Sequence, residues 1–288
     1  MKFKKMHGLG NDFIVADFES VKNENINTLA EFLCDRRFGI GGDGLILRCD
    51  SEVADFKMRI INSDGTEPEM CGNGIRVFAR YIWEAGITKS KSFTVETLAG
   101  IIVPEIIATE PFMVKVNMGK PELEHAKIPV DLCGNGESCI SLEDASFDFT
   151  PVSMGNPHCV IMVDKLDDVD FYKYGPLIEK HEYFPKKVNV EFVELLDEGH
   201  VKLKVWERGC GETLACGTGA CSVAVAASLQ GISGDRTVVS LPGGDLVIEW
   251  VQGGSVFMTG PAEMVFNGEF DLNLVGQQIE NWNKTKIS

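Results

Sequence analysis

A gapless internal repeat constrains the fold of this 288-residue chain more than any other feature. The string Met70-Cys71-Gly72-Asn73-Gly74-Ile75-Arg76-Val77-Phe78-Ala79 returns, altered, as Ala215-Cys216-Gly217-Thr218-Gly219-Ala220-Cys221-Ser222-Val223-Ala224, 145 residues later. At the same offset Asn11 meets Asn156, and Asn62 meets Glu207. Because these positions align without a gap, we expect two pseudo-equivalent domains. A pseudo-twofold packing would bring the two cysteine loops face to face across a cleft.

The pattern of apolar residues predicts many strands and few helices. Helical spacing is confined to residues 26–37, 72–85, 169–181 and 217–230. Strand patterns occupy residues 56–61, 93–97, 112–117, 158–163, 188–195, 201–206, 237–241, 245–251 and 255–258. A doubly wound sheet would alternate strands and helices regularly. We therefore expect an α/β chain of the α+β type.

Composition excludes several kinds of partner. Forty-three acidic and 27 basic residues leave a net charge of −16, the wrong sign for a protein that binds nucleic acid by neutralising phosphates. No stretch of about 18 apolar residues and no export signal is found, so we expect no membrane segment. Nine cysteines, an odd number without a signal peptide, favour thiols in a reducing cytoplasm.

Metal and nucleotide sites are not expected either. Zinc ligands cluster in short loops such as Cys-x-x-Cys, and no such pair occurs. Residues 39–44 fit the glycine pattern of a dinucleotide-binding loop, but they follow a predicted helix and lead into Leu45-Ile46-Leu47. In a nucleotide site the loop would open a helix instead.

The two cysteine loops carry the most chemical information. Cys71 and Cys216 each precede a helix that begins at a glycine, so their sulfurs lie among unsatisfied N–H groups at the positive end of the helix dipole. We expect this setting to lower the pKa of both thiols. The same N–H groups could receive a carboxylate of a ligand. The alternative to a chemical role is a structural one, in which each Gly-x-Gly is a tight turn into a packed helix and the cysteine only fills space.

Two opposed thiols suit the inversion of a stereocentre that bears a hydrogen. A proton leaves one face of the carbon and another arrives on the opposite face, so an acid and a base of similar pKa must flank it. A nucleophilic cysteine assisted by His158 would leave the second loop unexplained. A thiol–disulfide oxidoreductase usually has its two cysteines close together in sequence.

Several motifs together resemble the diaminopimelate epimerase family. They are Met6-His7-Gly8-Leu9-Gly10-Asn11-Asp12-Phe13, Asn62-Ser63-Asp64-Gly65, Cys71-Gly72-Asn73-Gly74, Gly155-Asn156-Pro157-His158-Cys159, Glu207-Arg208-Gly209 and Ala215-Cys216-Gly217-Thr218-Gly219. The resemblance implies interconversion of L,L- and meso-diaminopimelate, a step toward lysine and cell-wall precursors, with no cofactor and no metal. It also implies two domains, residues 1–118 plus 264–288 and residues 119–263, each a mixed, partly rolled sheet around a central helix, with the active site between them.

The resemblance also assigns roles to single residues. It makes Cys71 and Cys216 the catalytic acid/base pair, and it places the substrate α-carboxylate at Gly72-Asn73 and Gly217-Thr218. The rest of the substrate would be bound by Asn11, Asn62, Asn156, Asn189, Glu207 and Arg208, with His158 and Glu207 as modulators of the thiol pKa values. A substrate with two amino-acid ends needs a guanidinium for a carboxylate and an acceptor for an ammonium, which fits Arg208 and Glu207.

One position departs from the family pattern, and some questions stay open. Many family members have a glutamine where this chain has Gly44. The near-identical loops leave open which cysteine is the base for which isomer. The family suggests a cytoplasmic homodimer. The alternatives are a proline racemase-like enzyme, although its motif reads Cys-Gly-His-Gly, and a non-catalytic amino-acid-binding protein.

Overall fold

The computed structural model describes residues 1–131 and 138–286, and Cys133 lies outside them. The chain divides into two compact units, Met1–Val116 with Pro261–Ser288 (unit 1) and Asn117–Gly260 (unit 2). Within the described residues, none of the helices combines the length and apolar composition needed to cross a lipid bilayer.

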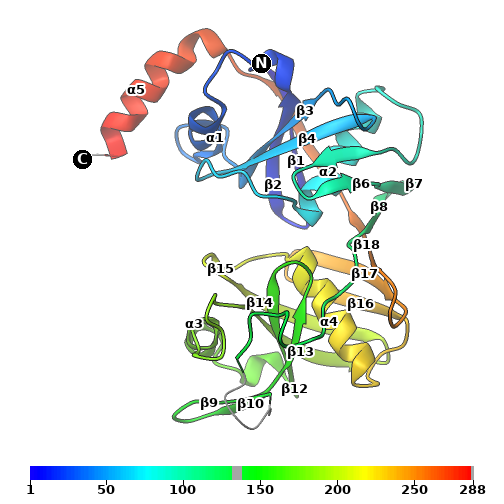
Figure 1. Cartoon of the computed structure of the whole chain (residues 1–288). Coiled ribbons are helices and arrows are strands. Elements are labelled where there is room, and N and C mark those ends of the chain that lie inside the picture. Colours follow the sequence, from blue (N-terminus) through cyan, green and yellow to red (C-terminus); the bar gives the residue numbers. More distant parts are fainter. Residues whose placement is uncertain (132–137, 287–288) are drawn as a thin grey trace. The chain divides into compact units, whose positions relative to one another are not determined.

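Unit 1 is built on one mixed sheet (Figure 1). Its strands in spatial order are β19 (Glu263–Glu269), β1 (Lys2–Gly8), β2 (Asn11–Asp17), β3 (Gly44–Cys49), β4 (Phe56–Asn62), β5 (Val95–Thr97) and β6 (Gly100–Ile102). A hairpin of β7 (Glu105–Thr109) and β8 (Phe112–Asn117) follows. The helical segments are η1 (Phe18–Ser20), α1 (Ile26–Cys34), α2 (Gly72–Glu84), η3 (Leu272–Leu274) and α5 (Val275–Lys286).

Unit 2 repeats this plan. Its main sheet contains, in spatial order, β11 (Thr150–Ser153), β12 (Pro157–Val163), β13 (Asn189–Asp197), β14 (His200–Glu207), β16 (Arg236–Leu241), β17 (Gly244–Trp250) and β18 (Val256–Pro261). The short β15 (Gly211–Glu212) pairs with β14, and β9 (Cys139–Ser141) pairs with β10 (Ser146–Asp148). Its helical segments are η2 (Leu166–Asp168), α3 (Phe171–Glu179) and α4 (Gly217–Leu229).

The sequence repeat corresponds to a repeat of topology. Helices α1 and α3, and likewise α2 and α4, begin and end exactly 145 residues apart. The parallel pairing of β2 with β3 matches that of β12 with β13 in register, since Phe13 lies opposite Gly44 and His158 opposite Asn189. On either side of these parallel pairs the sheet continues antiparallel. In unit 1, β1 pairs with β2 and β4 with β3, and in unit 2, β11 pairs with β12 and β14 with β13. Each unit is therefore the same mixed sheet with the same two helices.

Both faces of each sheet are covered, which explains the continuous apolar runs in its strands. In β3, Leu45 and Leu47 pack with α1 in one core cluster, whereas the side chain of Ile46 points to Gly74 of α2. In β13, Val190 and Phe192 pack with α3. Alternation along β13 turns the intervening residue toward α4. Helix α4 is buried on nearly all sides, as a central helix must be.

The expected α+β fold class is confirmed, and the four predicted helices are present with shifted ends. The helix predicted over 26–37 ends at Cys34, because the Asp35 carboxylate accepts hydrogen bonds from the N–H groups of Arg37 and Phe38 and turns the chain. Sequence reasoning did not predict α5, whose buried Trp282 packs edge-on against Phe32 of α1 at 5.7 Å between ring centroids. Strand β1 was also missed, because its lysines obscure the alternation.

Candidate active site

In unit 1, Cys71 is the N-cap residue of α2. Its backbone is extended (φ −137°, ψ 118°), and its sulfur accepts a hydrogen bond from the N–H of Gly74 at 3.4 Å. A cysteine sulfur here takes the place of the usual capping oxygen. A side chain at Gly74 would press on Cys71 and on two buried isoleucines, since an added Cβ would lie 3.2–3.4 Å from them. The Cys-Gly-x-Gly pattern thus determines the start of the helix locally, through the cysteine cap and the small residue at Gly74.

Asn11 links this helix start to β2. Leu9 and Gly10 join β1 to β2 with positive φ angles of 56° and 83°, which places Asn11 at the head of β2. The Oδ1 atom of Asn11 accepts hydrogen bonds from Asn73 Nδ2 at 3.2 Å and from the Cys71 thiol at 3.8 Å. Arg76, fully buried, donates to Asn73 Oδ1 at 2.9 Å and to the carbonyl of Gly72 at 3.1 Å.

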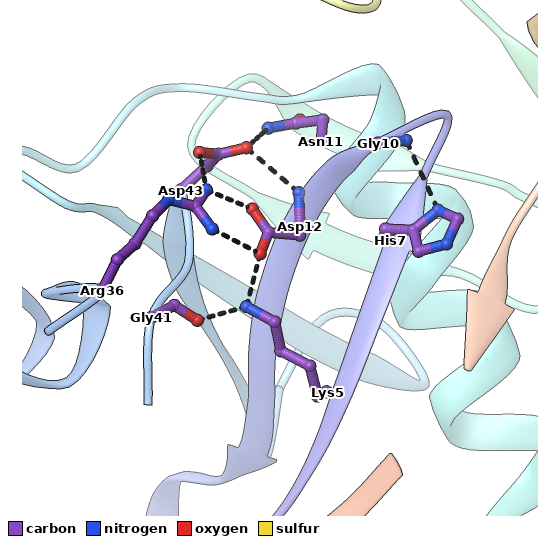
Figure 2. Close-up of polar contacts among 8 residues, drawn as sticks. All are labelled: Lys5, His7, Gly10, Asn11, Asp12, Arg36, Gly41 and Asp43. Atoms are coloured by element: carbon purple, nitrogen blue, oxygen red, sulfur yellow. Dashed lines mark hydrogen bonds and ion pairs between the residues drawn. The ribbon is translucent and has the colours of Figure 1, made fainter. Parts of the chain in front are cut away.

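A charged cluster behind Asn11 fixes its amide group, as Figure 2 shows. The Nδ2 atom of Asn11 donates to Asp43 Oδ2 at 2.8 Å. Arg36 donates to both Asp12 and Asp43, and Lys5 pairs with Asp12 at 2.5 Å and also donates to the carbonyl of Gly41. Burial raises the pKa of Asp12, but the hydrogen bonds from Arg36 and Lys5 outweigh it and lower the pKa to about 2.

Two other positions in unit 1 bear on the sequence-based assignments. Asn62, at the end of β4, donates its amide to Thr66 Oγ1 at 3.1 Å. Gly44, the position that departs from the expected family pattern, lies on β3 between β2 and β4, and a Cβ there would stand 2.9 Å from the carbonyl oxygen of Ile61. Since a backbone atom makes this contact, the present conformation has no room for a side chain at Gly44.

In unit 2, Cys216 caps α4 with the same geometry. Its backbone is extended (φ −117°, ψ 109°), and its sulfur accepts from the N–H of Gly219 at 3.4 Å. The hydroxyl of Thr218 lies 3.5 Å from the same sulfur. Gly217, like Gly72 in α2, is the first residue of its helix.

The expectation that the helix start lowers the thiol pKa is wrong for Cys216. Burial raises the pKa of this thiol well above its ordinary value, and the carboxylates of Glu207 and Glu191 raise it further. Hydrogen bonds from Thr218 and from the Gly219 N–H act in the opposite direction but do not compensate. The helix terminus therefore contributes the local effect predicted, and the tertiary environment reverses the net result.

His158 lies on β12 and is completely buried. Its Nδ1 atom is 2.6 Å from Glu191 Oε1, and its Nε2 atom is 3.1 Å from Asn156 Oδ1. The Nδ2 atom of Asn156 in turn donates to Thr218 Oγ1 at 3.3 Å. The structure thus connects the predicted residues Asn156, His158, Thr218 and Cys216 in one hydrogen-bonded chain.

The remaining predicted residues of unit 2 lie where β13 and β14 meet the next loop. Asn189 is buried and holds the loop, donating to the carbonyl of Pro157 at 2.8 Å and accepting from the Arg208 N–H at 3.0 Å. Glu207 accepts from Thr213 Oγ1 at 2.5 Å. The guanidinium of Arg208 is exposed, and no carboxylate among the described residues pairs with it. That group is accessible to an anionic ligand.

Sequence reasoning missed Asp43, Arg76 and Glu191. Each contacts a predicted residue, and Glu191 carried a detectable signal, because it is a charged residue between the apolar Val190 and Phe192 and aligns with Ile46 at the offset of 145. Within the described residues, no three His, Cys, Asp or Glu side chains are grouped to hold a metal ion.

Comparisons with known proteins agree with these motifs. The family model for diaminopimelate epimerase matches residues 3–124 and 150–265. A diaminopimelate epimerase of Carboxydothermus hydrogenoformans is 56% identical over 277 residues, which cover 94% of this chain and 100% of the relative. One of Methanococcus maripaludis is 50% identical over 277 residues, with the same coverage of both chains.

Solved structures with low sequence identity share the fold. A phenazine biosynthesis protein of the PhzF family from Bacillus anthracis superposes with a TM-score of 0.72 at 18% identity, covering 94% of this chain and 99% of that chain. A hydroxyproline epimerase from Agrobacterium vitis superposes with a TM-score of 0.64 at 16% identity, covering 94% and 90%. These similarities establish the architecture, and the extensive sequence identity establishes the family. The chain belongs to the diaminopimelate epimerase family.

Proposed function

We propose that this isomerase interconverts L,L- and meso-diaminopimelate by proton transfer between Cys71, Cys216 and the α-carbon of the substrate. One observation carries the mechanism: two cysteines cap equivalent helices, each with its sulfur 3.4 Å from the N–H of the third helical residue. An inversion needs one proton carrier on each face of the carbon. Two pseudo-equivalent thiols supply an acid and a base of the same chemical type.

Substrate binding would use the groups around the two helix starts. The N–H groups at Gly72-Asn73 and Gly217-Thr218 suit the α-carboxylate, because the first N–H groups of a helix have no partner within the helix. The exposed Arg208 suits the distal carboxylate and Glu207 an ammonium group. Asn11, Asn62, Asn156 and Asn189 would complete the site. We propose no cofactor and no metal ion.

We also propose that residues 1–118 plus 264–288 and residues 119–263 act as the two domains of the enzyme, each supplying one of the two thiols. Removing a proton from an α-carbon builds negative charge, and a closed site without water strengthens the groups that stabilise it. The family further suggests a homodimer in the cytoplasm, with a small molecule and no nucleic acid as ligand. Size-exclusion chromatography with light scattering tests the dimer.

The decisive experiment is incubation of the purified chain with L,L-diaminopimelate in deuterated water without added cofactor. Chiral chromatography and mass spectrometry should find meso-diaminopimelate with deuterium at the inverted carbon. Turnover of proline or hydroxyproline in its place would indicate a proline racemase-like enzyme. Binding of diaminopimelate without any exchange would identify a binding protein and would rule out the proposed activity.

A further inference from the structure

Unit 2 contains a hydrogen-bonded chain that runs from a buried carboxyl group to the Cys216 sulfur. Glu191 Oε1 meets His158 Nδ1 at 2.6 Å, and His158 Nε2 meets Asn156 Oδ1 at 3.1 Å. Asn156 Nδ2 meets Thr218 Oγ1 at 3.3 Å, and this oxygen lies 3.5 Å from Cys216 Sγ. The family resemblance accounts for the middle of this chain and leaves Glu191 at its far end unexplained.

Burial of the Glu191 carboxyl group lowers the stability of the fold. Its side chain and that of His158 have no solvent exposure, and Glu191 Oε2 has no hydrogen-bond partner among the residues that the structure describes. At the equivalent positions of unit 1 the chain has the apolar Phe13 and Ile46. Apolar residues therefore satisfy the fold at this place, and replacing a buried ion pair by packed hydrocarbon often stabilises a protein.

Glu191 also lies directly beside the start of α4. A Cβ added at Gly219 would stand 3.0 Å from Glu191 Oε1 and 3.3 Å from the Cys216 sulfur. The carboxyl group of β13 thus lies close to the first turn of the helix that Cys216 caps. This closeness allows two opposite effects on the thiol: the repulsion of a nearby negative charge, or support through the hydrogen-bonded chain.

The proton shared by Glu191 and His158 determines the direction of every bond in the chain. With one proton between Nδ1 and Oε1, Nε2 keeps its own hydrogen and donates to Asn156 Oδ1. Asn156 then turns its NH₂ group to Thr218, whose hydroxyl hydrogen is left to donate to sulfur. Burial raises the pKa of Glu191, which acts in favour of retaining this proton. Its loss would allow every bond to reverse.

The equivalent asparagine of unit 1 is oriented the other way. Asn11 must turn its NH₂ group to Asp43, because a carboxylate paired with Arg36 only accepts hydrogen bonds. Its oxygen then faces Cys71 and accepts from the thiol. Asn11 therefore stabilises the protonated Cys71, whereas the chain from Glu191 delivers a donor toward Cys216.

We propose that Glu191 is a positioning residue that, with His158, fixes this chain so that the Thr218 hydroxyl donates to Cys216 and supports its thiolate. The inference rests on the proposed function, since it deepens the role of Cys216 as a proton acceptor. Among the described residues of unit 2, the carboxyl groups of Glu191 on β13 and Glu207 on β14 act on Cys216, and His158 on β12 is hydrogen-bonded to Glu191. Strand β11 has no titratable residue, and Arg236, Asp245 and Glu249 occupy positions alternate to the buried residues of β16 and β17.

The test is a pH titration of Cys216 in the full chain. The titration is monitored by NMR of protein labelled with ¹³C at the cysteine β-carbons. The Cys216→Ser spectrum assigns the signal. In Glu191→Ile, which installs the residue of unit 1, we expect the Cys216 midpoint to move upward and kcat/KM for diaminopimelate to fall about tenfold, the size of one lost hydrogen bond to a charged group. Glu191→Gln should stay near the parent, because its amide N–H can donate to Nδ1.

A second variant keeps the test informative if Glu191→Ile does not fold. Thr218→Val keeps the shape of threonine but removes the last donor, so it should also move the midpoint upward, and Thr218→Ser should restore it. The double variant Glu191→Ile/Thr218→Val should shift the midpoint no further than either single change. Ser222→Ala is the matched control, since Ser222 is buried on the same helix and lies outside the chain.

The sign of the shift decides the outcome. If Glu191 acts only as a nearby negative charge, both Glu191→Gln and Glu191→Ile will move the Cys216 midpoint downward, and the proposal is wrong. If Glu191 is merely structural, thermal stability will change and the midpoint will not. Because the NMR titration does not depend on turnover, an absence of epimerase activity would contradict the proposed function and still leave this measurement interpretable.

Discussion

Replacing Asp12 with asparagine should destabilise the chain by about 2–3 kcal/mol at pH 7. Asp12 pairs with Lys5 at 2.5 Å and with Arg36 at 2.7 Å, and the Lys5 side chain is only 9% exposed. A pKa of about 2 against the ordinary 3.8 corresponds to about 2.4 kcal/mol, because each pH unit is worth about 1.4 kcal/mol. Because the Arg36 side chain is exposed, solvent screens its interaction with Asp12. The lowered pKa of Asp12 therefore accounts for about 1–2 kcal/mol of the free energy of unfolding.

The rest of the expected loss comes from Lys5. Breaking a fully buried pair by removing one partner costs about 3–5 kcal/mol. In Asp12→Asn the Lys5 ammonium still donates to the carbonyl of Gly41, so the loss of unfolding free energy should be smaller. Urea unfolding followed by circular dichroism measures the difference in the free energy of unfolding.

The pH dependence tests the explanation itself. A lowered carboxyl pKa contributes stability above the ordinary pKa, and this contribution is lost as the pH falls from 3.8 toward 2. The titration part of the gap between parent and Asp12→Asn should therefore narrow as the pH falls from about 4 to about 2, with about half of it lost by pH 3. Glu19→Gln, which removes an exposed pair with Lys22, is the control and should change nothing measurable. Equal stability at pH 7, or a gap that stays constant down to pH 3, would refute the reasoning.

Four further substitutions test the site and its packing. Cys71→Ala and Cys216→Ala should each lower epimerisation at least ~10²–10⁴-fold, since one face loses its proton carrier; full two-way turnover in deuterated water by either variant would exclude the two-thiol mechanism. Arg208→Lys should raise KM, because an ammonium cannot form the two parallel bonds of a guanidinium with a carboxylate, and steady-state kinetics with normal kcat/KM would make Arg208 structural. Gly44→Ala should lower the free energy of unfolding by about 1–3 kcal/mol, because its Cβ would lie 2.9 Å from the Ile61 carbonyl, and an unchanged urea midpoint would contradict this packing.

Local features of the site were predictable because they depend on a few consecutive residues. A cysteine followed by Gly-x-Gly caps a helix through the N–H three residues later, so the starts of α2 and α4 were predicted to the residue. The gapless repeat predicted two similar halves, since matched apolar patterns build matched strands and helices. Strands such as β1 were missed, because the burial of Lys5 depends on Asp12 and on the carbonyl of Gly41.

Only the tertiary structure decided how the two halves differ. The sequence alone determined that Cys71 and Cys216 sit at equivalent helix starts and that Asn11 and Asn156 are paired by the repeat. Asn11 donates to the carboxylate of Asp43, 32 residues away in the sequence, whereas Asn156 meets the imidazole of the nearby His158, which is itself held by Glu191 of β13. The thiol pKa of Cys216 likewise depends on burial and on charges from β13 and β14. Desolvation and hydrogen-bond direction are properties of neighbours in space, so a pattern of consecutive residues does not contain them.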